Sequence, residues 1–356
     1  MPAPIPNAAP GSRISSLDGL RAISIVLVLT NHAIPGTHSF IFRLLFLHAA
    51  LGVNVFFVIS GFLITSLLLK ERSETGGISL RLFYIRRALR ILPAFCVFVG
   101  AVAILNAYGI VRVPAAIWPY VLTYTVNFST QAPWVLGHLW SLSVEEQFYL
   151  LWPLVMAFAK PRVWMSVAVL SVFAGIGIRA LNSLAGVALL NPVTLHYAFP
   201  FVCGPIAMGC LLAINSSEVR RFITASRFLS GGRMFLVAVP LIAFLDTLDL
   251  GAPNPFIAIA TSALLTLCVA RLVFVPAGAV SRLLNSAPLV GLGKLSYSIY
   301  LFQQLFLDSL YRHPAIPLPF PLNLLGALAA ASICYWGVES RFFPLRHRFR
   351  ATFRTA

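Results

Sequence analysis

Apolar stretches long enough to cross a bilayer recur along the whole chain. They begin near Leu17, Leu51, Ile91, Leu139, Val163, Val193, Met234, Pro255, Leu289 and Leu322. Each covers roughly 17 to 24 residues, about what a 30 Å hydrocarbon layer requires. Because 59% of the residues are hydrophobic and only 10% are charged, the chain cannot bury its apolar surface in a core of its own. The sequence therefore predicts an all-α, polytopic membrane protein with about ten transmembrane helices in contact with lipid.

The Lys and Arg residues indicate which side of the membrane each loop faces. With ten spans and an internal N-terminus, all but four of the 26 Lys and Arg residues lie inside, as the positive-inside rule requires. The four outside are Arg43, Arg112, Arg179 and Arg312. If the shorter run 115–128 also spanned, most of these cations would lie outside. We therefore predict that both termini are cytoplasmic and that 115–128 is a re-entrant or surface segment on the outer side.

Domain organisation follows from the same pattern. The chain has no internal repeat and no soluble domain, so we predict one membrane domain over residues 15–344, with a flexible tail at 1–14 and a basic cytoplasmic tail at 345–356. The net charge of +16 is divided into short clusters between apolar runs, which argues against a nucleic-acid partner. The five cysteines lie in apolar segments without a C-x-x-C pair, which indicates packing residues and neither disulfides nor metal ligands.

The first span carries ionisable residues, which are costly in lipid and therefore candidates for function. Arg21 and His32 are eleven residues apart, about 16 Å and about three turns of helix, so their side chains point to the same side. This pattern favours a polar cavity through the protein. The alternative is that Arg21 reaches the inner headgroups and His32 the outer ones. An imidazole is well suited to proton transfer at neutral pH.

The second span combines small residues with one amide. Gly52, Ser60 and Gly61 favour the close approach of a neighbouring helix, and Asn54 is a polar group near the outer end.

A basic face precedes the third span. Arg86, Arg87 and Arg90 lie three and four residues apart, so they share one side of a helix. Guanidinium groups match phosphate oxygens, which suits a multiply phosphorylated ligand. The alternative is anchoring to anionic lipid.

Two carboxylates enter the fourth span within the stretch Trp140–Tyr149. Ser143 and Glu146 have the spacing of a capping box, which gives Glu146 a structural explanation. Glu145 has none, so we expect a functional role for at least one of the two. His138, just before this stretch, is compatible with a place at the headgroup level.

Taken together, these segments resemble the acyltransferase-3 family of integral membrane acyltransferases. The matching pieces, in chain order, are Leu17–Arg21 with His32, residues 52–64, Phe83–Pro93, Trp140–Tyr149, Ser296–Leu301 and Glu339. They cover nearly the whole chain in the expected order.

The resemblance implies ten helices around a polar cavity in the cell inner (plasma) membrane. It implies an acyl-coenzyme A donor, with acetyl as the acyl group, and no bound cofactor. The acceptor would be a hydroxyl of a surface or exported carbohydrate or glycolipid, with macrolides as an alternative acceptor class. Arg21 and His32 would form the family's Arg-x10-His pair, and Arg86, Arg87 and Arg90 would hold the donor's phosphates.

The expected mechanism centres on His32, acting as general base on the acceptor hydroxyl or as a transient acyl-imidazole. Glu145 would orient the imidazole or bind the acceptor. We assign acceptor binding to Asn54, Glu146 and Tyr149.

Two positions depart from the family pattern, and neither change is expected to affect Arg21 and His32. Asn54 replaces the usual Asp, and Gln303 stands where His is frequent after Ser-Tyr-x-x-Tyr-Leu-x. Two rival functions remain open, a proton-coupled membrane transporter and a non-catalytic scaffold in polysaccharide assembly. A transporter typically has inverted repeats, and the sequence shows no such symmetry.

Overall fold

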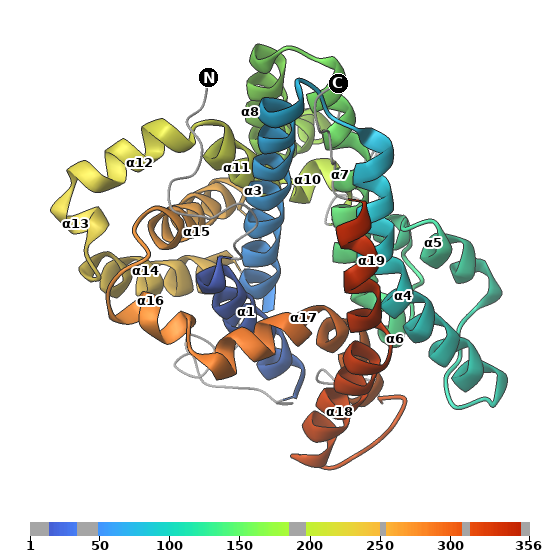
Figure 1. The fold of residues 1–356 in the computed structure, drawn as a ribbon. Coiled ribbons are helices and arrows are strands. Elements are labelled where there is room, and N and C mark those ends of the chain that lie inside the picture. The colour runs from blue at the N-terminus through green and yellow to red at the C-terminus, as the bar shows by residue number, and fades with distance from the viewer. Residues whose placement is uncertain (1–13, 34–48, 185–196, 250–253, 308–313, 350–356) are drawn as a thin grey trace. The chain divides into compact units, whose positions relative to one another are not determined.

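The computed structural model describes residues 14–33, 49–184, 197–249, 254–307 and 314–349. Within these ranges every regular element is a helix, and none is a strand (Figure 1). The predicted all-α fold is therefore confirmed. Most of the two predicted tails, 1–14 and 345–356, falls outside the described residues.

The predicted apolar runs coincide with long helices. Nine of the run starts lie in helices of the described chain: α1 (Ser15–Ala33), α3 (Ala49–Thr75), α4 (Leu80–Ala107), α7 (Leu139–Phe158), α8 (Pro161–Leu184), α14 (Arg233–Asp249), α15 (Pro255–Phe274), α17 (Ala287–Phe306) and α18 (Leu322–Gly337). The run from Val193 begins outside the described residues and continues into α10 (Phe199–Val202) and α11 (Gly204–Ile214). In the described part of the chain, 5 helices are long and apolar enough to cross a membrane.

Large apolar side chains cover the outer surfaces of several of these helices. Leu170 on α8 is 69% exposed, Leu236 on α14 is 76% exposed, and Ile333 on α18 is 74% exposed. Apolar surface of this kind is stable in contact with lipid and unfavourable in water. The chain is therefore a membrane protein.

Segment 115–128, which we predicted to lie on the outer side, does not form a spanning helix. It is divided into η1 (Ala115–Ile117), the five-residue helix α5 (Trp118–Leu122) and η2 (Val126–Phe128). A helix of that length is far shorter than the roughly 20 residues a bilayer requires. Val121 and Val126 are buried in a core with α4, α7 and α17, so the segment packs against protein.

The described residues form two compact units, which we treat separately. Unit 1 comprises residues 1–31, 36–70 and 161–294. Besides the long helices it includes α12 (Ser216–Ala225), α13 (Arg227–Ser230) and α16 (Ala279–Leu284). Its core centres on side chains such as Phe62, Leu212 and Val269.

Close contact between α3 and α11 explains one of the small residues of the second span, Gly61. A Cβ atom added to Gly61 would collide with the backbone oxygen of Ile206, and one added to Gly209 would collide with that of Val58. Each helix therefore presents a glycine to the backbone of the other, and the predicted packing role of Gly61 is confirmed.

Unit 2 comprises residues 32–35, 71–160 and 295–356. It contains α4, α7, α18 and most of α17, together with α6 (Trp134–Gly137), η3 (Glu339–Phe342) and α19 (Phe343–Arg348). Its core includes Phe98, Leu139 and Phe302. Most of the predicted site residues lie in this unit.

Candidate functional site

His32 lies near the end of α1 and is held by a glutamine of α17. Its Nδ1 is 2.8 Å from Oε1 of Gln303, and Gln303 is completely buried. The edge of the ring meets Trp134 with 5.1 Å between ring centroids, and the Trp134 indole N–H donates to the carbonyl of Leu307. Because an amide oxygen only accepts, Nδ1 carries the proton and Nε2 is left as the basic nitrogen of the neutral ring.

This contact corrects one sequence expectation. We expected the replacement of the family's His by Gln303 not to affect the Arg21 and His32 pair. The structure instead makes Gln303 the hydrogen-bond partner of His32, so the replacement changes the group that orients the imidazole.

A second histidine, His138, occupies an equivalent position beside Gln304. Its Nδ1 lies 2.7 Å from Oε1 of Gln304, and its backbone N–H donates to the same oxygen at 3.2 Å. The Tyr300 hydroxyl donates to its carbonyl, and the ring meets the edge of Phe98 at 5.5 Å. His138 is only 4% exposed, so its side chain is enclosed by protein.

Helices α4 and α7 run antiparallel in unit 2, and their register places the other predicted residues. The Arg87 guanidinium lies 4.7 Å from the ring centroid of Tyr149, while Phe98 meets His138 at the other end. Arg87 and Phe98 are eleven residues apart on α4, and so are His138 and Tyr149 along the start of α7. Eleven residues of helix correspond to about 16 Å of rise. Arg90 and the two carboxylates therefore lie between the Arg87 level and the His138 level.

The two carboxylates are interior residues of α7. The helix begins at Leu139 directly after α6, and Ser143 donates its hydroxyl hydrogen bond to the carbonyl of Leu139. Ser143 and Glu146 thus do not form the predicted capping box. Oε1 of Glu146 is buried, and it has no hydrogen-bond partner among the described residues. Unmatched acceptors of this kind are costly, which leaves Glu146 as a candidate for ligand binding.

Tyrosines of α17 form hydrogen bonds with both α4 and α7. Tyr297 donates to the carbonyl of Ile91 on α4 at 3.0 Å, and Tyr300 lies 2.6 Å from the Ser141 hydroxyl on α7. Glu339, the last motif residue, is buried and accepts a hydrogen bond from Ser298 at 2.8 Å. These contacts give the Ser296–Leu301 and Glu339 motifs a structural role around the site.

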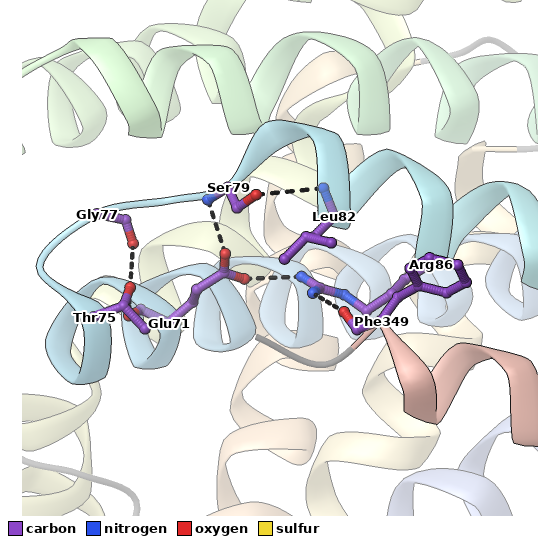
Figure 2. Close-up of polar contacts among 7 residues, drawn as sticks. All are labelled: Glu71, Thr75, Gly77, Ser79, Leu82, Arg86 and Phe349. Carbon is purple, nitrogen blue, oxygen red and sulfur yellow. Dashed lines mark hydrogen bonds and ion pairs between the residues drawn. The ribbon is translucent and has the colours of Figure 1, made fainter. Parts of the chain in front are cut away.

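Arg86 differs from Arg87 and Arg90 in its surroundings. It forms an ion pair with Glu71 at 2.8 Å and donates to the carbonyl of Phe349 (Figure 2). The other carboxylate oxygen of Glu71 accepts from the backbone of Ser79, which in turn caps α4. Arg86 therefore stabilises the turn between α3 and α4, and its predicted contact with the donor stays a prediction.

Arg21 and Asn54 belong to unit 1. The Arg21 guanidinium lies 5.9 Å from the ring centroid of Phe56, and Asn54 is half-buried on α3. As predicted, Arg21 and His32 share one helix, α1.

Three residues around the imidazoles were missed as site residues: Gln304, Trp134 and Tyr300. The signal for Gln304 was present, because two consecutive glutamines inside a span need polar partners. Trp134 and Tyr300 carry no such signal, since aromatic residues are ordinary in membrane helices.

The helical fold of the described residues and the two histidines held by Gln303 and Gln304 define a membrane protein with a polar site among its helices. A family model described as an acyltransferase domain matches residues 14–338. The chain therefore belongs to this acyltransferase family, and the predicted enzyme class is confirmed at the level of the family. The chain is similar to the O-acetyltransferase OatA of Staphylococcus aureus strains NCTC 8325 / PS 47, COL and MRSA252, with 30% identity over 94% of this chain. It spans 57% of the length of these relatives. No solved structure matches the chain.

Proposed function

We propose that this protein is a membrane O-acyltransferase that moves an acetyl group from acyl-coenzyme A to a hydroxyl of a surface or exported carbohydrate. The observation that carries the proposal is the hydrogen bond between His32 Nδ1 and Gln303. It directs the proton to one ring nitrogen and leaves the other free to act as a base or nucleophile. The OatA relatives, whose name is O-acetyltransferase, support the transferred group and the oxygen acceptor.

The donor phosphates are assigned to Arg87 and Arg90, with Arg21 and Arg86 as further predicted contacts. Arg87 and the histidine level are separated by about 16 Å along α4. A donor that is bound by its phosphates at Arg87 must therefore carry its reactive carbon on a long arm. The pantetheine arm of acyl-coenzyme A meets that requirement, and a small acyl phosphate does not.

The acceptor is assigned to the outer side of the site. Glu145 and Glu146 lie between the Arg87 level and the His138 level, and the buried oxygen of Glu146 has no partner among the described residues. A carboxylate oxygen accepts hydrogen bonds from sugar hydroxyls. The sequence also predicts acceptor contacts for Asn54 and for Tyr149, of which Tyr149 lies at the Arg87 level.

The proposed topology has ten transmembrane helices, both termini in the cytoplasm and a place in the cell inner (plasma) membrane. The arginines of α4 then face the cytoplasmic supply of acyl-coenzyme A. His32 lies at the far end of α1, toward the outer side, where an exported carbohydrate is presented.

The test uses purified protein in proteoliposomes with radiolabelled acetyl-coenzyme A and polysaccharide fragments. His32→Ala is expected to lower transfer by about 10²–10⁴-fold, the usual contribution of a general base. Thr30→Ala, on the same helix, removes only a hydroxyl bonded to the carbonyl of Val26 and should leave transfer intact. Unchanged transfer in His32→Ala would remove the mechanism. Uptake of substrate without acylation would favour the transporter.

A further inference from the structure

We infer that His138 is a second catalytic imidazole, which takes the proton from the acceptor hydroxyl while His32 carries the acyl group. The inference rests on the proposed function and goes beyond it, because it decides between the two roles left open for His32. Three observations support it: the tautomer of His138, its burial, and the absence of a hydrogen-bond partner for its Nε2 among the described residues.

The tautomer of His138 follows from its contact with Gln304. The backbone N–H of His138 can only donate a hydrogen bond. The Gln304 side-chain atom that lies 3.2 Å from this backbone nitrogen is therefore the amide oxygen, Oε1. The same oxygen lies 2.7 Å from Nδ1, so Nδ1 must donate to it as well. Nε2 of the neutral ring therefore carries no proton and is an acceptor only.

That nitrogen is buried and has no hydrogen-bond partner among the described residues. An unmatched buried polar atom destabilises the fold, so Nε2 gives a purely structural histidine no benefit. The neighbouring Gln303 amide nitrogen is also buried without a partner in the described chain. Both atoms are available to a bound ligand, and Nε2 of His138 requires a ligand that donates, such as a hydroxyl.

The ring of His138 is fixed more firmly than a surface histidine. Its edge contacts involve Phe98 at 5.5 Å and Tyr300 at 5.4 Å, and its carbonyl accepts from the Tyr300 hydroxyl. A base held in one orientation contributes more to rate than a mobile one, because the reacting geometry is already formed.

The two imidazoles are linked through consecutive residues of α17. Gln303 binds His32 and Gln304 binds His138. Trp134, which contacts the His32 ring, lies one helical turn before His138 on the continuous stretch of α6 and α7. Both rings therefore belong to one polar cluster of unit 2.

A second base is needed if His32 becomes acylated. In the first step His32 Nε2 attacks the thioester carbon, the C–S bond breaks, and its electron pair leaves with the thiolate. The acyl-imidazole formed cannot then accept a proton at Nε2. In the second step the acceptor oxygen bonds to the acyl carbon, the C–N bond breaks, and the hydroxyl proton moves to His138 Nε2. His138 later returns that proton to the thiolate, which regenerates both rings and gives an ester and a free thiol.

The experiment separates the two steps in proteoliposomes. Exchange of labelled coenzyme A into acetyl-coenzyme A, measured without acceptor, reports the first step. Transfer of labelled acetyl to polysaccharide fragments reports both. His138→Asn keeps a donor at the Nδ1 position for Gln304 and removes the atom at the Nε2 position. We expect it to retain exchange and to lose transfer by about 10²-fold or more, whereas His32→Ala should lose both.

Other outcomes overturn the inference. Wild-type transfer in His138→Asn would make His138 structural, and equal loss of exchange and transfer would place its effect before the second step. If His138→Asn does not fold, His138→Phe retains the ring contacts and is judged in the same way.

Transfer without exchange in the wild-type protein would exclude an acyl-imidazole while leaving the proposed function standing. An absence of wild-type transfer would reject the proposed function itself.

Discussion

Oε1 of Gln303 accepts a hydrogen bond from Nδ1 of His32 across 2.8 Å, although the two residues are separated by 271 positions in the chain. The contact determines which nitrogen of His32 is basic. It also explains why a change at position 303 cannot be neutral for the site.

Replacing Gln303 tests that contact directly. Gln303→Leu leaves Nδ1 of His32 without its acceptor, so the ring loses its fixed tautomer and orientation. We expect kcat to fall by up to about 10²-fold, the cost of a misplaced reacting group, with KM for acetyl-coenzyme A unchanged. Gln303→His restores an acceptor and should retain more activity than Gln303→Leu. Steady-state kinetics of both variants measure the difference, and equal activity would argue against an orienting role.

Gln304 is expected to matter more for stability than Gln303. Gln304→Leu removes the acceptor of two buried donors, the backbone N–H and Nδ1 of His138. Each unmatched donor costs about 1–3 kcal/mol. Thermal unfolding in detergent should therefore give a lower Tm for Gln304→Leu than for Gln303→Leu. The opposite order would mean that the His138 contacts do not stabilise the fold.

The arginines of α4 should control donor affinity. Arg90→Gln removes a charged contact worth about 1.5–3 kcal/mol, which corresponds to roughly a 10–100-fold rise in KM for acetyl-coenzyme A. Arg221→Gln removes the same charge from α12, where the side chain is 81% exposed, and should leave KM unchanged. If both variants raise KM alike, the effect of Arg90 is a general one of surface charge.

The contact between α3 and α11 should tolerate no added methyl group. Gly61→Ala and Gly209→Ala each force apart two helix backbones, and overpacking of this kind costs about 1–3 kcal/mol. Gly177→Ala is the matched control, because its added Cβ meets no atom of another described segment within 4 Å. A comparison of Tm values in detergent checks this expectation, which would be wrong if all three variants were equally stable.

The proposed topology predicts which side of the membrane each segment faces. In a Cys96→Ser background, Phe128→Cys in the outer segment should react with an impermeant maleimide added to intact cells. Phe222→Cys on α12 should react only after permeabilisation. Both native side chains are exposed, at 43% and 64%, so accessibility does not limit labelling. Reaction of Phe222→Cys in intact cells would reverse the assigned sides.

Hydropathy alone located the helices, because a run of about 20 apolar residues is a sufficient condition for a membrane helix. The close approach of another helix to α3 was also visible in Gly61. Both predictions, the positions of the helices and the packing role of Gly61, use the sequence of one helix at a time and do not require knowing which helices are neighbours.

The histidine contacts could not be predicted, because they join residues 271 and 166 positions apart. No local pattern pairs His32 with Gln303. The capping box failed for a related reason. Its spacing is a valid signal only at a helix start, and the helical conformation at His138 places Ser143 inside the helix.

Consecutive side chains of a helix point about 100° apart, so Gln303 and Gln304 reach their two histidines in different directions from one short piece of α17. Insertion or deletion of a single residue just before this pair would rotate both amides away at once. Substitution there can alter one histidine at a time, whereas a change in length would disable both.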